Sequence, residues 1–302
     1  MRKLKIAQIG VGHDHAMGII NTLKKQTHLF EIAGLAVPKE EAGKYQEKLD
    51  QHCKDITRLT VEEIMQDATI EAVAIETEEV NLTNYALLAA QYGKQIHMDK
   101  PGGFELADFE YLIEILKEKK LVFHLGYMYR YNQAVTKLLQ EIKAGELGEI
   151  FSVEAHMDCR HVPEKRQWLE QFPGGMMFFL GCHLVDLLLQ IRGVPERIIP
   201  YNRSTGVDNV TAKDYGMVVF DYPNGVSFAK TCAEEMGGFD RRQLVVTGSK
   251  KTVEIRPLEM FGNFEGIYTG VRTSTSEVWT DSGYHTNTPP VDRYETMMES
   301  FY

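Results

Sequence analysis

Strand-like and helix-like patterns alternate over roughly the first 125 residues of the chain. Short apolar runs predict buried strands at residues 3–9, 30–37, 72–75, 95–98 and 121–125, with a weaker one at 56–59. Between them, apolar positions with helical spacing predict helices over 12–26, 38–50, 61–67, 80–92 and 104–119. Strands that alternate with helices form parallel sheets with right-handed crossovers. We therefore predict an α/β protein that begins with a Rossmann doubly wound parallel sheet over residues 1–126.

The pattern changes after residue 126. A helix is predicted over 132–144, and period-two alternation then predicts strands at 150–157, 197–201, 216–220, 226–232, 243–247 and 252–255. One long helix, over about 175–192, interrupts the strands. Successive strands with one covering helix predict an α/β domain with an open, mostly antiparallel sheet over 127–302. A last helix is predicted from about residue 292 to the end, which leaves open whether the C-terminus is complete.

The composition limits the possible partners of the chain. Its 302 residues suffice for two domains, and 43% hydrophobic with 25% charged residues is typical of a globular protein. The formal net charge of −10 would repel phosphate backbones, so we expect no nucleic-acid and no membrane-surface partner. The most apolar stretch, 176–191, contains His183 and Asp186 and therefore predicts a buried helix instead of a membrane span.

The N-terminus and the cysteines suggest a compartment. The apolar core of MRKLKIAQIG is too short for a signal peptide and leads directly into the first predicted strand. The four cysteines are scattered without a Cys-x-x-Cys pair, at Cys53, Cys159, Cys182 and Cys232. We therefore expect a cytoplasmic protein with reduced thiols.

A glycine loop follows the first strand in the stretch IAQIGVGHDHAMG at 6–18. Gly10, Val11 and Gly12 stand between a strand and a helix, where backbone N–H groups and the helix N-terminus can approach a pyrophosphate. The loop therefore predicts a dinucleotide site, although position 15 carries a histidine where the third glycine of such loops usually stands.

His13, Asp14 and His15 are residue types that can bind a metal ion. Adjacent residues in a turn rarely converge on one ion, so we expect these side chains to pack the loop or contact the cofactor. His13 and Asp14 are taken as cofactor-binding candidates, and no metal site is predicted.

The second strand should end in an acid that binds the adenosine ribose. It ends instead in Ala36, Val37, Pro38 and Lys39. The Lys39 ammonium would suit the 2′-phosphate of NADP, and it is equally consistent with a solvated surface charge. Both NAD and NADP remain possible cofactors, with Val37 and Lys39 as candidate contacts.

A lone lysine stands in the stretch HMDKPGG at 97–103. Lys100 falls at the carboxyl end of the predicted strand 95–98, where a ligand of the sheet would bind. Pro101 stiffens the turn, and two glycines after it allow the backbone to come close to a ligand. An ammonium held there could relay the proton that alcohol oxidation releases, and a surface lysine in a loop explains the spacing equally well.

The sequence resembles the Gfo/Idh/MocA oxidoreductases, the family of glucose–fructose oxidoreductase and inositol 2-dehydrogenase. The resemblance covers nearly the whole chain and rests on IAQIGVG at 6–12, Thr77, AAQYGKQIHMDKPGG at 89–103, GYMYRYN at 126–132, GELGEI at 145–150 and GGMMFFLGCHLVD at 174–186. It implies bound NAD or NADP, contacts to the cofactor from Thr77 and Pro101, and a catalytic role for Lys100. It also implies a cis peptide before Pro101 and a homodimer or homotetramer packed through the C-terminal sheet.

The second candidate catalyst is His183. A lone histidine on an apolar helix is more often a core residue, but the resemblance implies an acid/base or substrate-binding role. Many relatives carry an aspartate four residues earlier, on the same helical face; here that position is Phe179. Asp186 could orient the imidazole or pair with another partner.

Further substrate candidates lie in the second half of the chain. Arg130 could bind cofactor or substrate or form a structural ion pair, and Trp168 could stack on a sugar ring or anchor its loop. The remaining candidates are Tyr127, Phe179, His156 and Asp158. His156 and Asp158 share one face of a predicted strand with Glu154. A zinc site of Cys159, His161 and His183 lacks the usual ligand spacing.

These observations favour an NAD(P)-dependent oxidoreductase for a sugar, polyol or related hydroxy compound, with Lys100 as proton relay and His183 assisting. Two alternatives remain. One is a redox-neutral enzyme of the glycoside-cleavage type that keeps its NAD bound, and the other is a nucleotide-binding sensor without catalysis.

Overall fold

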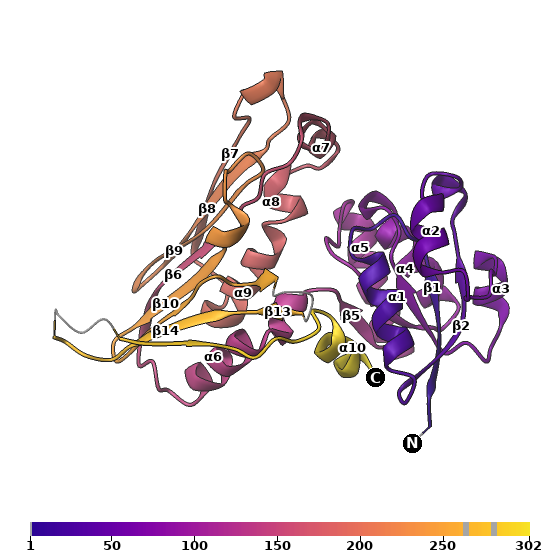
Figure 1. The fold of residues 1–302 in the computed structure, drawn as a ribbon, viewed down its shortest axis with the longest axis horizontal. Coiled ribbons are helices and arrows are strands. Elements are labelled where there is room, and N and C mark those ends of the chain that lie inside the picture. The colour runs from indigo at the N-terminus through magenta and orange to yellow at the C-terminus, as the bar shows by residue number, and fades with distance from the viewer. Residues whose placement is uncertain (1, 262–265, 279–282) are drawn as a thin grey trace. The chain divides into compact units, whose positions relative to one another are not determined.

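The computed structural model describes residues 2–261, 266–278 and 283–302. The chain divides into two compact units (Figure 1). The first unit contains the residues up to Met128 together with Arg293–Tyr302, and the second contains Tyr129–Asp292. Within these described residues, none of the helices has both the length and the apolar character needed to cross a bilayer.

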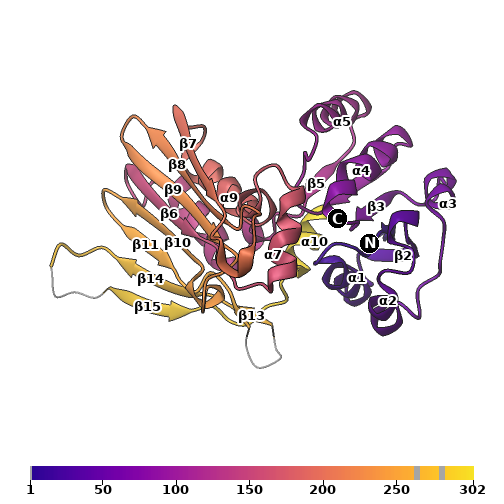
Figure 2. The same cartoon turned by 90° about the horizontal axis from the view of Figure 1, so that it is seen from above.

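The first unit is built on a five-stranded parallel sheet in the order β2-β1-β3-β4-β5. The strands are β1 (Leu4–Ile9), β2 (Phe30–Ala36), β3 (Ala72–Ile75), β4 (Gln95–Met98) and β5 (Phe123–Leu125). The helices α1 (Ala16–Lys25) and α2 (Gln46–His52) lie on one face, and α4 (Leu82–Gln91) and α5 (Leu106–Lys119) on the other (Figure 2), while α3 is Val61–Gln66. Helices on both faces bury the sheet, which explains the nearly continuous apolar runs of its strands.

The weak strand predicted at 56–59 is reduced to a single parallel bridge between Arg58 and Leu35. Leu35 donates to the carbonyl of Thr57, and Leu59 donates back to the carbonyl of Leu35. With this segment counted as the third strand, the order becomes that of the dinucleotide-binding doubly wound fold. The predicted Rossmann sheet is therefore confirmed.

Two predicted helices begin or continue differently in the structure. α1 begins at Ala16 and not at residue 12, because the preceding residues form a turn in which the His15 N–H donates to the His13 ring. The helix predicted over 38–50 is split into the 3₁₀ turn η1 (Lys39–Glu41) and α2. Gly43 lies between them with φ of +77°, a conformation that ends a helix.

The last helix, α10 (Glu295–Phe301), belongs to the first unit. It buries Met297, Met298 and Phe301 and contacts α1. The Gln26 side chain donates to the carbonyl of Glu295 at 2.9 Å, so a segment from the end of the chain completes the core of the first unit.

The second unit is built on an eight-stranded sheet in the order β15-β14-β11-β10-β6-β9-β8-β7 (Figure 2). The strands are β6 (Ile150–His156), β7 (Arg197–Arg203), β8 (Tyr215–Tyr222), β9 (Gly225–Cys232), β10 (Gln243–Gly248), β11 (Thr252–Ile255), β14 (Gly270–Ser274) and β15 (Tyr284–Asn287). Neighbours are antiparallel except for the parallel pair of β6 and β9. The predicted open, mostly antiparallel sheet is thus confirmed.

Helices of the second unit cover one face of this sheet. The helix predicted over 175–192 is broken into α8 (Met176–Phe179) and α9 (Cys182–Arg192), and α9 packs on β6 and β9. α6 (Gln133–Lys143) begins after Asn132, whose side chain accepts hydrogen bonds from two amides of the first turn. The short helix α7 (Pro163–Trp168) lies in the connection after β6, and β12 (Met260–Phe261) pairs with β13 (Ile267–Tyr268).

Candidate functional site

The glycine loop of the first unit lies against the loop that follows β3. Gly10 has φ of +90°, and its N–H donates to the carbonyl of Ala36 at 2.8 Å. A Cβ at this position would lie 2.5 Å from the backbone nitrogen of Thr77, which is fully buried. Only glycine therefore fits at position 10, where the loop packs directly against Thr77.

A carboxylate accepts hydrogen bonds from the backbone amides of this loop. Glu41, which is 1% exposed, accepts hydrogen bonds from the N–H of Val11 at 2.8 Å and of Gly12 at 3.1 Å. Its other oxygen accepts from the N–H of Glu78 at 2.7 Å. Burial raises the pKa of Glu41, while the backbone hydrogen bonds oppose that rise. The loop amides thus hold a carboxyl group of the chain itself, and backbone amides in such a loop are groups that can also bind phosphate oxygens.

A cavity of about 580 Å³ opens at the carboxyl end of β2. The predicted contacts Val37 and Lys39 line it, with Lys39 exposed. Its other walls are largely apolar or aromatic and include Pro38, Leu59, Tyr85, Leu88 and Tyr92. Such a pocket is large enough for a planar base. The loop amides and this cavity together fit a dinucleotide.

Lys100 lies directly beyond β4 and is 2% exposed. Its N–H donates to Asp99 Oδ1 at 2.7 Å, and its carbonyl accepts from His13 Nε2 at 2.7 Å. The peptide bond to Pro101 is cis, as the resemblance implies. The backbone of the predicted catalytic lysine is therefore held from both sides at the carboxyl edge of the sheet.

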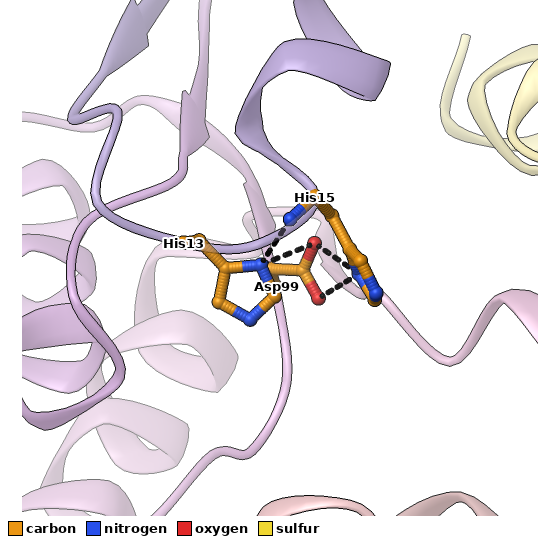
Figure 3. A group of neighbouring side chains, drawn as sticks. All are labelled: His13, His15 and Asp99. Carbon is orange, nitrogen blue, oxygen red and sulfur yellow. Dashed lines mark hydrogen bonds and ion pairs between the residues drawn. The ribbon is translucent and has the colours of Figure 1, made fainter. Parts of the chain in front are cut away.

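His13, His15 and Asp99 come together in the first unit, with the carboxylate between the two rings (Figure 3). Asp99 Oδ2 lies 3.3 Å from His13 Nδ1 and 3.0 Å from His15 Nδ1. Burial lowers the pKa of His13 to about 3 and also lowers that of His15. Burial alone would raise the pKa of Asp99, but the histidines and Lys100 hold it well below its usual value. The turn before α1 thus curls both rings toward Asp99, a residue distant in sequence.

Two further buried groups border this cluster. Glu76 is fully buried, with one oxygen 3.8 Å from His13 Nδ1 and the other 3.5 Å from His97 Nε2. Burial and the neighbouring Asp99 raise the pKa of Glu76 well above its usual value, and burial lowers that of His97 to about 4. Asp14, by contrast, is exposed.

In the second unit, His183 lies on α9 and is 1% exposed. Its ring meets that of Tyr129 edge-on, with the centroids 4.9 Å apart. Asp186 pairs with Arg130, whose Nε donates to it at 2.7 Å and whose terminal nitrogen makes a second contact. Of the two roles considered for Asp186 and for Arg130, the structure contains the ion pair between them.

Phe179 belongs to an aromatic cluster and is 3% exposed. Its ring centroid lies 5.2 Å from that of Trp168 and 5.7 Å from that of Phe172. The Lys165 ammonium lies 3.7 Å from the centroid of Trp168. Trp168 thus packs within this aromatic cluster, and the position of the family carboxylate is filled by apolar packing.

The remaining substrate candidates differ in burial. Asp158 is fully buried beyond the end of β6 and accepts from the Lys230 ammonium at 3.2 Å, and burial raises its pKa to about 6. His156 is half-buried beside Phe228, and Tyr127 is half-buried after β5. In this structure Asp158 is an ion-pair partner of Lys230.

Glu41, Glu76 and Asp99 were not among the predicted site residues. Asp99 carried a signal, since it is a charged residue at the carboxyl end of a buried strand, beside the lysine. Glu41 carried none, because it lies five residues beyond the end of β2 and reaches the loop only through the fold.

Comparisons with known proteins match both halves of the chain. Residues 4–127 match the oxidoreductase family with an NAD-binding Rossmann fold, and residues 135–254 match the GFO/IDH/MocA C-terminal domain. An uncharacterized oxidoreductase of Escherichia coli, YhhX, is 29% identical over 139 residues, which are 46% of this chain and 40% of that protein.

Trans-1,2-dihydrobenzene-1,2-diol dehydrogenase of Mus musculus is 26% identical over 178 residues, which are 57% of this chain and 51% of that enzyme. The chain thus spans about half the length of the curated relatives it matches first. The crystal structure of aldose-aldose oxidoreductase from Caulobacter crescentus, complexed with glycerol, has a TM-score of 0.79 at 18% identity, over 99% of this chain and 88% of that one. At that identity the likeness shows the fold alone.

Proposed function

The chain belongs to the Gfo/Idh/MocA oxidoreductases, whose N-terminal domain is an NAD-binding Rossmann fold, and from this premise we propose that it is an NAD(P)-dependent dehydrogenase. Its substrate in this proposal is a sugar, polyol or related hydroxy compound. The observation that carries the proposal is the buried Lys100, held by Asp99 and His13 at the carboxyl edge of the Rossmann sheet.

The residues of the chain have distinct roles in this proposal. When bound, the nicotinamide supplies the hydride chemistry. The loop of Gly10, Val11 and Gly12 binds the dinucleotide, with Thr77 behind it. Lys100 donates a hydrogen bond to the substrate oxygen and moves the hydroxyl proton. His183 is the second candidate acid/base group.

The proposal is tested with a panel of sugars and polyols and with both nicotinamide nucleotides. Binding of a nucleotide, followed by its stoichiometric reduction with at least one substrate, is the expected result. Substrate turnover without net NADH or NADPH would identify the redox-neutral alternative. Nucleotide binding without turnover of any panel member would favour the sensor, and no binding at all would refute the cofactor assignment.

Glu41 favours NAD over NADP in this proposal. Its carboxylate is held at the glycine loop, and Lys39, two residues before it in the chain, lines the cavity at β2. A buried negative charge there repels a 2′-phosphate more strongly than it repels a ribose hydroxyl group. The exposed Lys39 ammonium is solvated and offsets this only weakly.

We expect Glu41→Gln to lower the ratio of the NADP to the NAD dissociation constant by about tenfold, which corresponds to about 1.4 kcal/mol. Glutamine keeps the shape of the side chain but removes its charge. Titration calorimetry with both nucleotides measures the two dissociation constants. A substitution that weakens the binding of both nucleotides equally leaves their ratio unchanged.

The matched control is Glu47→Gln, which removes an exposed carboxylate on α2. Solvent screens that charge, so the ratio should stay unchanged. An unchanged ratio in Glu41→Gln as well would show that Glu41 does not select the cofactor.

A further inference from the structure

The three side chains that surround Asp99 Oδ2 in the first unit have the chemistry of a metal site. We propose that His13, His15 and Asp99 bind one divalent transition-metal ion of the zinc type, at the carboxyl ends of β1 and β4. Two imidazoles and one carboxylate are a donor set that zinc and its first-row neighbours accept. The proposal does not rest on dehydrogenase activity, because the metal can be bound and measured without nucleotide or substrate.

The distances suit such an ion. Two ligand atoms that each lie about 2.0–2.1 Å from a tetrahedral metal are roughly 3.3 Å apart. Asp99 Oδ2 lies 3.3 Å from His13 Nδ1 and 3.0 Å from His15 Nδ1, and the three ligand atoms all lie within 4.8 Å of one another. Small side-chain rotations therefore bring the three atoms around one centre.

The hydrogen bonds of His13 fix the tautomer that a metal requires. Its Nε2 lies 2.7 Å from the carbonyl of Lys100, which can only accept, so Nε2 carries the proton. In the neutral ring, Nδ1 then carries the lone pair, which accepts a hydrogen bond from the His15 N–H at 3.1 Å and lies 3.3 Å from Asp99 Oδ2. A bound cation would take this lone pair in place of the His15 N–H. Metal-binding histidines commonly donate their second ring N–H to a backbone carbonyl in this way.

The neighbouring Glu76 supplies an independent indication. It is fully buried, one oxygen lies 3.8 Å from His13 Nδ1, and as an acid it can share a hydrogen bond with Asp99. A cation at this position would take the place of the shared proton between the two carboxyl groups. Glu76 is therefore the candidate for the fourth ligand, either directly or through a water molecule.

His15 is the most exposed member of the cluster. The side chains of His13 and Asp99 are fully buried, whereas that of His15 is 11% exposed. In this proposal an incoming ion meets His15 first. The bound ion would tie the turn before α1 to the end of β4, and so hold the glycine loop next to Lys100.

The test uses the whole chain without a histidine tag, stripped of metal by a chelator and titrated with Zn²⁺ against a chromophoric competitor. One equivalent with a dissociation constant of about 1 µM or tighter is expected. His15→Gln should weaken binding by about 100-fold or more, whereas the control His28→Gln, an exposed histidine of the same unit, should not. Thermal melting checks that each variant is folded.

X-ray absorption at the zinc edge of the unaltered protein gives a readout that depends on no variant. It should show nitrogen and oxygen ligands with two imidazoles and no sulfur. Stoichiometry well below one, affinity weaker than about 100 µM, equal affinity in His15→Gln, or a sulfur ligand would each overturn the site. Nucleotide titrations of the metal-free protein are scored separately, so a failure of the metal site and a failure of the proposed function remain distinguishable.

Discussion

Replacing Lys100 with methionine is expected to lower kcat/KM by about 10³-fold or more and to change the nucleotide dissociation constant by less than about threefold. Methionine fills much of the same buried space but cannot donate or move a proton. Because the glycine loop and the cavity at β2 are untouched, cofactor binding should survive. Steady-state kinetics with an active substrate and titration calorimetry with the nucleotide measure the two effects.

Lys94→Met is the matched control for this variant. Lys94 is also buried, at 4% exposure, but it precedes β4, at the opposite end of the strand from Lys100. Its ammonium donates to the carbonyls of Asp67 at 2.7 Å and Ile70 at 2.8 Å. Its loss should lower the melting temperature and leave kcat nearly unchanged. If Lys100→Met kept its turnover, or if both variants lost it equally, the proton-relay role would be wrong.

The strands from β1 to β11 were predictable because burial leaves a local trace, whereas β12 to β15 were not predicted. β3 and β4 are covered on both faces, so every position of AVAI at Ala72–Ile75 is apolar and buried. The alternating strands of the second unit are equally readable, since β8 alternates half-buried and buried residues along its whole length. Patterns of this kind need only near neighbours in sequence.

The side-chain partners of the site were not predictable, because they join segments far apart in the chain. Glu41 reaches the amides of Val11 and Gly12 across 30 and 29 residues, and Asp99 reaches His15 across 84. Asp186 had two possible partners on the sequence alone, and only the fold brings Arg130 to it. A pattern predicts which face of an element is polar, but the pairing depends on how the elements pack.

The position of the last helix illustrates the same limit. A helix near the C-terminus was predicted, and α10 confirms that it exists. No periodicity could indicate that it packs with α1, where a Cβ on Gly18 would lie 2.3 Å from the ring of Tyr294. The glycine at position 18 thus makes room for a residue 276 positions away in the chain, which a local sequence pattern cannot predict.

The second large effect is expected from Gly10→Ala. A Cβ at this position would lie 2.5 Å from the Thr77 nitrogen and 2.6 Å from its Cα, and backbone atoms cannot rotate away. The residue also has φ of +90°, which costs a non-glycine residue about 1–2 kcal/mol by itself. We expect destabilisation of the first unit by about 3 kcal/mol or more, and a melting temperature lower by roughly 9 °C or more.

Gly93→Ala separates the two contributions. Gly93 has φ of +75°, but a Cβ there would meet nothing within 4 Å, so this variant carries the backbone cost without the clash. It should lower the melting temperature by only about 3 °C and keep nucleotide binding. Gly10→Ala should instead lose most of its nucleotide affinity, because the loop must move away from Thr77 to accommodate the methyl group. Equal melting shifts and equal affinities in the two variants would mean that the loop does not need the close approach to Thr77, and that Gly10 is required for its backbone conformation alone.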